Sequence, residues 1–199
     1  DGSSYNFVVT TTKRPTQNGT SYNYNDVSIV QGTYATDSFI FDNQLANPKF
    51  VLSNERVDKG KMIVSVTSGG ATETYTLSTG ISNITTTSTV YYAQENEEGY
   101  IEIYFGDGTL GKSLLDGDVI DVTYIIVDQD HANGASQFAL NGVVNGFTNH
   151  AVTNVSPASG GAEKESIESI KFKATKFYTS QNRLVTLNDY KAKVQEYYP

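Results

Sequence analysis

The sequence predicts a mainly β protein, an antiparallel sandwich or barrel-like set of strands, followed by a short α-helical C-terminal segment. Three observations predict this class. Short stretches rich in Val, Ile, Tyr, Phe and Thr recur between turn residues from about residue 5 to residue 155. Fourteen tyrosines and nine phenylalanines accompany abundant Thr, Ser, Asn and Gly, which favours strands with polar outer faces. After residue 160 the apolar spacing becomes helical.

The first strands are expected within residues 5–12, 26–34 and 38–42. Pro15 and the Asn18-Gly19 pair mark a turn after the first of them. A further strand is expected within residues 48–58. Apolar and polar side chains then alternate through residues 61–70, and residues 73–78 are expected to return from the Gly69-Gly70 turn. The last three strands are expected within residues 89–95, 100–105 and 118–127.

Residues 106–113 spell G-x-x-x-x-G-K-S, the pattern of a phosphate-binding loop. That loop needs a helix after it, so that helix N–H groups and the lysine converge on phosphate. Only Leu114 and Leu115 precede the turn pair Asp116-Gly117, and a strand follows. We therefore predict a β-hairpin connection instead of a nucleotide site. Its structural residues are Gly106, Asp107, Gly108, Gly111, Asp116 and Gly117.

The C-terminal segment contains two amphipathic helical patterns. An apolar stripe at positions i, i+3, i+7 and i+10 consists of Ile167, Ile170, Ala174 and Phe177. Glu163 and Glu165 precede this stripe, where carboxylates favour the positive end of a helix dipole. Thr186-x-x-Asp189 resembles a capping box that opens a second helix. The second stripe consists of Leu187, Tyr190, Val194 and Tyr197.

These stripes need a surface to cover them, because two short helices cover each other only in part. The interface is therefore predicted at Ile167, Ile170, Phe177, Leu187, Tyr190 and Val194. We divide the chain into a β-rich N-terminal segment (1–47), a β domain with the hairpin (48–160), and a helical segment (161–199) that opens a truncated downstream domain. The first residue is not Met, and the last lies in a predicted helix. We interpret the chain as a fragment of a longer protein.

Composition excludes several classes of protein. The formal net charge of −8 is spread along the chain, which argues against a nucleic-acid or anionic-membrane surface. The absence of cysteine excludes disulfides and thiolate metal sites. No apolar run approaches the roughly 20 residues that span a bilayer. We therefore expect neither nucleic acid nor membrane as a partner.

The residues that could carry catalytic chemistry do not form the pattern of an enzyme site. His131 and His150 are the two histidines, and each lies in a polar loop without a second His beside it. No G-x-S-x-G sequence marks a nucleophile. Carboxylate pairs for glycoside cleavage could come from four aspartates, Asp107, Asp116, Asp118 and Asp121. Turn chemistry and strand alternation explain all four.

A calcium site in the acidic loop at 128–134 fails the EF-hand pattern, because its position 6 is Asn133 instead of Gly. A looser cation site at Asp128 and Asp130 stays open beside a solvated turn. We expect no enzyme activity, no cofactor, no catalytic or metal residues and no small-molecule substrate.

Two ordered stretches carry a family resemblance. "VYYAQENEEGYIEIYFGDGTLGKSLLDGDVIDVTYIIVDQDHANGASQF" resembles the F-G-D-G-x-x-G-K region of the baseplate J-like family. "GGAEKESIESIKFKATKFYTSQNRLVTLNDYKAKV" resembles the following segment, with its Gly-Gly, Q-N-R and V-T-x-x-D-Y sequences. The chain is similar in particular to the baseplate wedge proteins of T-even-type contractile-tailed phages, over about residues 48–197. It departs from them at Ala174-Thr175, where Ala-Pro is expected.

The resemblance implies a structural subunit that builds the baseplate ring around the tail hub. Its implied partners are itself, as a dimer or ring in the full-length protein, and other baseplate wedge subunits. The implied location is the virion tail baseplate, assembled in the host bacterial cytoplasm. Two alternatives remain open from the residues alone. One is a glycan- or receptor-binding β-module of a phage tail, which would normally end on a strand instead of helices. The other is an NTPase, which the hairpin argument disfavours.

Overall fold

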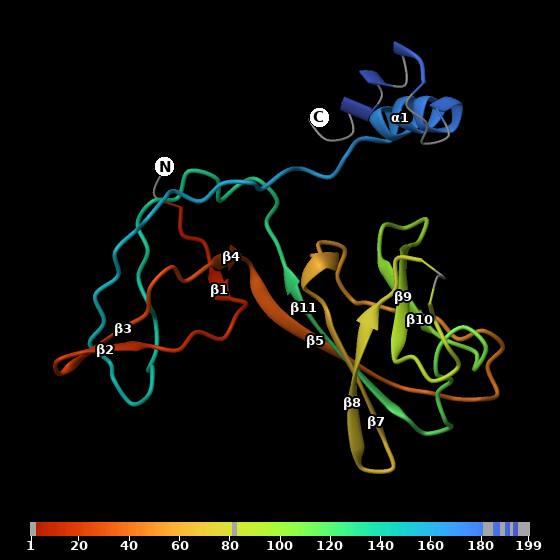
Figure 1. Cartoon of the computed structure of the whole chain (residues 1–199), viewed down its shortest axis with the longest axis horizontal. Helices are drawn as coiled ribbons and strands as arrows, with labels where there is room; N and C mark the ends of the chain where they lie inside the picture. The colour runs from red at the N-terminus through yellow and green to blue at the C-terminus, as the bar shows by residue number, and fades with distance from the viewer. Residues whose placement is uncertain (1–2, 81–82, 181–184, 188–189, 192, 195–199) are drawn as a thin grey trace. The chain divides into compact units, whose positions relative to one another are not determined.

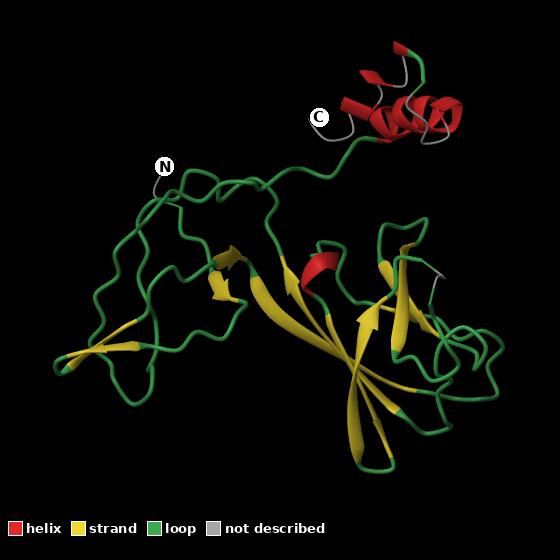
Figure 2. Ribbon diagram, viewed as in Figure 1, coloured by secondary structure: helices red, strands yellow, loops and turns green. Residues whose placement is uncertain are grey.

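The computed structural model describes residues 3–80, 83–180, 185–187, 190–191 and 193–194. Strands occupy the first two thirds of the chain, and the α-helix α1 (Ile167–Ser180) follows near the C-terminus. Figure 2 shows the strands in yellow and the helical segments in red. The predicted class, mainly β with a short helical C-terminal segment, is confirmed.

The strands are short at the start of the chain and longer in its middle. The first four are β1 (Phe7–Val9), β2 (Thr16–Asn18), β3 (Ser21–Asn23) and β4 (Ile29–Gln31). The next four are β5 (Thr33–Ile40), β6 (Phe50–Val51), β7 (Ile63–Ser68) and β8 (Ala71–Leu77), with the 3-10 turn η1 (Lys59–Lys61) before β7. The last three are β9 (Val90–Glu95), β10 (Ile101–Phe105) and β11 (Val119–Ile126).

Seven strands form one curved sheet in the order β5-β11-β7-β8-β9-β10-β6. In Figure 1, β7 and β8 make a long hairpin, with β11 and β5 following on one side and β9 and β10 on the other. Two contacts join the strands at the ends of this order. The Asp37 carboxylate of β5 accepts hydrogen bonds from the backbone N–H and hydroxyl of Ser53, which follows β6, both at 2.8 Å. Phe39 of β5 contacts Phe50 of β6 with ring centroids 5.3 Å apart. The sheet is therefore a nearly closed barrel, which leaves few free strand edges.

The core lies inside this barrel and comes from alternate residues of its strands. On β11, Ile120, Val122 and Tyr124 point inward and are fully buried, as alternation along a strand requires. The rest of the core cluster consists of Phe50, Leu52, Val64, Val66, Tyr75, Tyr91, Ile101, Ile103 and Leu114. These large side chains supply most of the hydrophobic stabilisation.

The predicted hairpin between the last two strands is wrong. β10 pairs with β9 and β6, whereas β11 pairs with β5 and β7. Both edges of each strand are therefore occupied by other strands. Residues 106–118 connect two strands that are not neighbours, so this segment crosses one end of the barrel instead of making a tight turn. In addition, β8 and β9 are parallel, with only Thr76↔Val90 and Leu77↔Tyr91 in register.

The barrel begins and ends on neighbouring strands, because Thr33 at the start of β5 is opposite Ile126 at the end of β11. Gly32 precedes β5 with φ +138°, and an added Cβ would lie 2.4 Å from the Ile126 carbonyl oxygen. Only glycine fits this close approach. The segments that flank the barrel contact each other, since Phe7 and Phe138 pack edge-to-face at 5.1 Å. β1 also pairs with β4, and β2 with β3.

The chain divides into two compact units, residues 1–159 and residues 160–199. β5 lies in the seven-stranded sheet, although the expected N-terminal segment, 1–47, contained it. In the second unit, α1 carries the first predicted stripe, and Leu187, Tyr190 and Val194 of the second stripe are also helical. Tyr197, Asp189 and the side chain of Phe177 lie outside the described residues. The described helices are too short or too polar to cross a lipid bilayer.

Candidate functional site

The connection from β10 to β11, here called the glycine loop (residues 106–118), begins with a turn organised by one carboxylate. Asp107 Oδ1 accepts the backbone N–H of Thr109 at 2.8 Å and of Leu110 at 3.1 Å. The N–H of Gly108 donates to the Gly111 carbonyl at 3.1 Å. The bonds from Leu110 and Thr109 hold the pKa of Asp107 below its usual value. Asp107 is therefore a turn-forming carboxylate that stays ionised, and it is unsuited to be a general acid.

Two glycines of the glycine loop lie against each other. An added Cβ on Gly106 would be 2.5 Å from both the Gly111 carbonyl carbon and the Leu110 carbonyl oxygen. Gly111 has φ +99°, and an added Cβ there would lie 2.9 Å from Val90 Cγ2. Glycine is needed at Gly106 for space and at Gly111 for both space and backbone angle.

The glycine loop is fixed to the barrel on two sides. The N–H of Gly111 donates to the Thr85 carbonyl at 3.2 Å, and the N–H of Lys112 donates to the Ser88 carbonyl at 2.8 Å. At its other end, the N–H of Gly117 donates to the carbonyl of Phe41 at 2.9 Å. Phe41 in turn donates its N–H to the Asp118 carbonyl at 2.8 Å. These bonds use backbone groups that would otherwise be unpaired.

A phosphate cradle needs free backbone donors, a following helix and an available lysine. In the glycine loop, the N–H groups of residues 108–112 are all used within the protein. No helix occurs among the described residues between β10 and α1. Lys112 forms an ion pair with Glu73 of β8, and this hydrogen bond raises the pKa of the Lys112 ammonium. The geometry of the glycine loop is that of a structural connection.

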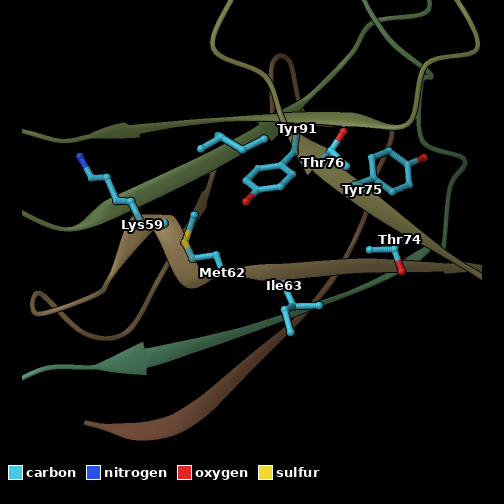
Figure 3. A pocket seen from close by; sticks show the side chains of 9 residues that line it. Lys59, Met62, Ile63, Thr74, Tyr75, Thr76 and Tyr91 are labelled. Carbon is cyan, nitrogen blue, oxygen red and sulfur yellow. The ribbon is translucent and has the colours of Figure 1, made fainter. Parts of the chain in front are cut away.

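A shallow pocket of about 320 Å³ lies beside the point where β8 and β9 diverge. Figure 3 shows Tyr91 and Met62 facing each other across it, with Lys59 at one end. Burial raises the pKa of the Tyr91 phenol, so the hydroxyl stays protonated. Lys59 lies 3.7 Å from Glu95. The volume is at the low end for ligand sites, and no acid–base pair converges in the pocket among the described residues.

The two histidines do not form a catalytic pair. His131 Nδ1 lies 2.7 Å from the Asp128 carbonyl oxygen, and His150 Nε2 lies 3.3 Å from the Gly142 carbonyl oxygen. Each imidazole therefore contacts backbone close by in sequence. Neither ring has a hydrogen bond to a serine or threonine hydroxyl among those that the structure describes.

Of the two residues considered for a cation site, Asp128 and Asp130, Asp128 is hydrogen-bonded to other side chains. Its Oδ1 accepts a hydrogen bond from Arg56 at 2.7 Å, and its Oδ2 accepts one from the Gln31 amide at 2.8 Å. The N–H of Asp128 donates back to Gln31 Oε1 at 2.7 Å. Both carboxylate oxygens are thus already used. No group of three or more metal-ligating side chains occurs in the described parts of the chain.

The remaining aspartates of the proposed carboxylate pairs also have structural partners. Asp116 Oδ1 accepts the N–H of Asn43 at 3.1 Å, and Asp118 Oδ2 accepts the N–H of Leu115 at 2.8 Å. Asp121 accepts a hydrogen bond from the Ser38 hydroxyl on the outer face of the sheet. Each carboxylate fixes a turn or a strand pair instead of facing another carboxylate across a cleft.

Two tyrosine rings on the outside of the barrel stack on each other. Tyr92 and Tyr104, opposite residues of β9 and β10, are stacked with centroids 5.2 Å apart and planes at 15°. The Tyr92 hydroxyl donates to the Leu110 carbonyl at 3.3 Å. One face of each ring is therefore used within the protein.

The predicted interface residues are exposed wherever the structure describes their side chains. Ile167 is 65% exposed and Leu187 is 71% exposed, which is unusual for large apolar residues. The other described members are Ile170, Tyr190 and Val194, and all three are exposed. Sequence reasoning missed Phe172, which is 60% exposed and lies off the predicted stripe of α1. Exposed apolar side chains gathered in one small unit are typical of an interaction surface.

Comparison with known proteins gives two matches. Residues 34–129 match the family model for the third domain of the bacteriophage baseplate wedge protein gp6. The chain is also 30% identical over 135 residues to the baseplate wedge protein gp6 of Enterobacteria phage T4. This second match covers 55% of the chain and 20% of that relative's length. The resemblance to part of a T4-type baseplate wedge protein is confirmed.

Proposed function

We propose that the chain is part of a structural subunit of a contractile-tail baseplate wedge, and that it builds the baseplate ring through protein–protein contacts. The observation that carries this proposal is that the family match and the barrel begin and end at nearly the same residues. The family match spans residues 34–129, and the barrel spans Thr33 to Ile126. The part that matches the family model therefore coincides with the seven-stranded barrel, which argues against chance similarity.

The barrel has the construction expected of a rigid connector. Its chain enters and leaves on neighbouring strands, so it can be inserted into a longer protein without separating the flanking segments. The glycine loop, which could have been a ligand site, has the backbone N–H groups of residues 108–112 used internally. We propose residues 33–126 as this structural barrel and residues 160–199 as a separate helical unit.

A scaffold without enzyme activity fits the chemistry of the described residues. The histidines contact local backbone, and the aspartates hold turns, strand pairs or Arg56. The baseplate location, the assembly of the protein in the host cytoplasm, and the lack of a cofactor or substrate all follow from this role, and they are part of the same proposal.

The helical unit is the proposed site of self-association. Its exposed residues Ile167, Ile170, Leu187, Tyr190 and Val194 would be covered in an assembly. Fully burying one such side chain contributes roughly 1.5–3 kcal/mol, so burying all five together would offset much of the free-energy cost of association. The partner in this proposal is a second copy of the chain, with other wedge subunits binding elsewhere.

Multi-angle light scattering on the 199-residue chain tests the proposal. The chain is measured over a concentration series, alone and with the other wedge subunits of the same virus. We expect a mass above that of a monomer, and a further increase when wedge subunits are added. Ile170→Glu and Val194→Glu should each return the chain to a monomer, because they place a charge in the apolar contact. Thr175→Glu is the matched control, since it adds the same charge to α1 off the predicted stripe.

Two results would contradict the proposal. A strictly monomeric wild-type chain at all concentrations would remove self-association through the helical unit. Failure to bind any wedge subunit, together with binding of a glycan to the barrel, would favour the receptor-binding alternative. Circular dichroism of each variant must match the wild type, so that loss of association is not mistaken for loss of folding.

A further inference from the structure

The sequence contains four Asn-Gly pairs, at residues 18–19, 133–134, 141–142 and 145–146. An asparagine before glycine is chemically vulnerable, because glycine has no Cβ to shield its backbone nitrogen. That nitrogen can attack the side-chain amide carbon of the asparagine. The reaction needs an accessible amide and a backbone that can bend, so the fold decides which of the four pairs reacts.

We propose that Asn141 is the principal site of spontaneous deamidation in this protein. Asn141 is exposed and lies outside regular secondary structure, as does Gly142. The carbonyl oxygen of Gly142 lies 3.3 Å from His150 Nε2. The N–H of Gly142 has no hydrogen-bond partner among the described residues. The attacking nitrogen is therefore accessible, and no hydrogen bond has to break before the ring closes.

Asn133-Gly134 is the most strongly protected of the four pairs. The N–H of Gly134 donates to the Ala158 carbonyl at 2.8 Å, and the N–H of Asn133 donates to the Asp130 carbonyl at 2.9 Å. Ala158 also donates its own N–H to the Ala135 carbonyl at 2.8 Å. The attacking nitrogen of Gly134 is thus held by one of two backbone hydrogen bonds between residues 134–135 and Ala158. This hydrogen bond has to break before the reaction.

The other two pairs lie in tight turns. Asn145 and Gly146 have φ values of +49° and +86°, and the flanking residues Val144 and Phe147 exchange backbone hydrogen bonds at 3.0 Å. The Asn145 side-chain amide also donates to the Tyr24 hydroxyl at 3.0 Å. Asn18 is paired with Ser21 across the β2–β3 hairpin. Ring closure at either asparagine requires its turn to open, so both should react more slowly than Asn141.

The backbone nitrogen of Gly142, after losing its proton to solvent, forms a bond to Cγ of Asn141. The bond from Cγ to Nδ2 breaks, and the nitrogen leaves as ammonia, which gives a five-membered succinimide. Water then opens the ring at either carbonyl, which leaves aspartate or isoaspartate at position 141. No oxidant, reductant or enzyme is needed.

The product changes the surface of the segment that follows the barrel. It adds a carboxylate to a chain whose formal charge is already −8. In the isoaspartate form it also adds one atom to the backbone. Phe147, six residues later, contacts Tyr22 of the β2–β3 hairpin with centroids 6.5 Å apart. Reaction at Asn141 therefore alters the loop that holds this hairpin in place.

Peptide mapping by mass spectrometry tests the proposal. The chain is incubated at mildly alkaline pH, both folded and in concentrated urea, and the mass gain at each asparagine is followed over time. For each asparagine, the deamidation rate in the folded chain is divided by the rate in the unfolded chain. This ratio removes the effect of the neighbouring residues in the sequence, because they are the same in both states. We expect this ratio to be near unity for Asn141 and at least about fivefold lower for Asn133, the factor that one backbone hydrogen bond represents.

Asn141→Gln is the matched variant, because its longer side chain would form a less favourable six-membered ring. It should abolish the reaction at position 141 and leave the other three rates unchanged. The proposal is overturned if Asn141 is protected as strongly as Asn133 in the folded chain. It is also overturned if Asn18, Asn133 or Asn145 reacts faster than Asn141 while the protein is folded.

Discussion

The hydroxyl of Tyr124 donates a hydrogen bond to Oδ2 of Asp37 at 3.0 Å, although the Tyr124 side chain is fully buried. The same hydroxyl accepts a hydrogen bond from the Asn54 amide at 2.7 Å. Asp37 also binds Ser53, so β11, β5 and the residues after β6 meet at this one hydroxyl. The polar centre of the barrel closure is therefore built on Tyr124.

Tyr124→Phe should lower the free energy of unfolding by about 1–3 kcal/mol, because it leaves Asn54 and Asp37 short of a buried partner. The measurement is the urea unfolding midpoint, followed by circular dichroism. Tyr34→Phe is the control, since the exposed Tyr34 hydroxyl donates only to the Val9 carbonyl at 3.2 Å. Its effect should stay within about 0.5 kcal/mol. Equal effects of the two variants would contradict the role given to Tyr124.

Gly106→Ala should destabilise the barrel by about 1–3 kcal/mol, because the new methyl group overlaps the backbone of Leu110 and Gly111. Gly80→Ala is the matched control, since nothing lies within 4 Å of an added Cβ at that position. The control should change the free energy of unfolding by no more than about 0.5 kcal/mol. Thermal unfolding measures both, and a neutral Gly106→Ala would show that the two glycines are not packed as described.

Most strands could be predicted from the sequence because their signals are local. The strand expected within residues 118–127 alternates apolar and polar residues, and its apolar residues Ile120, Val122 and Tyr124 are buried. The pairing of strands is not local. β10 and β11 are consecutive and separated by a turn-rich loop, which favours a hairpin, yet closure of the barrel places other strands beside each. The parallel β8–β9 pair was missed for the same reason.

The candidate functional residues could likewise be predicted from local sequence only in part. A four-residue stripe on α1 follows from helical spacing, so Ile167 and Ile170 could be identified as apolar positions. Phe172 lies off that spacing, and its exposure depends on tertiary packing, which local sequence does not encode. The hydrogen bonds to the Asp128 carboxylate could not be predicted either, since Gln31 and Arg56 are distant from Asp128 in the sequence.

The glycine loop should bind no nucleotide. Equilibrium dialysis against ATP with Mg²⁺ should show no saturable binding, because the backbone N–H groups of residues 108–112 are bonded internally and Lys112 is paired with Glu73. Lys112→Ala should behave like the wild type in this assay. Micromolar binding that disappears in Lys112→Ala would show that the loop can open into a phosphate cradle. Circular dichroism of Lys112→Ala should match the wild type, so that the comparison is made between folded proteins.

The stability of the barrel should fall in acid partly through Glu102, a residue of β10 that is only 8% exposed. Hydrogen bonds from Lys49, at 2.5 Å, and from Gln94 hold the pKa of Glu102 below its usual value. A carboxyl whose pKa is lower when folded binds fewer protons in the folded state. Its contribution is therefore complete above the unfolded value of about 4.3, and it is lost as pH falls through the lower folded value.

Glu102→Gln should make the loss of stability between neutral pH and acid less steep, because the amide keeps an acceptor for Lys49 but cannot take up a proton. Urea unfolding midpoints across this pH range measure the slope. Glu97→Gln is the matched control, since Glu97 is exposed in the turn between β9 and β10. The control should keep the wild-type slope. A Glu102→Gln profile parallel to the wild type would show that the Lys49 contact does not link barrel stability to pH.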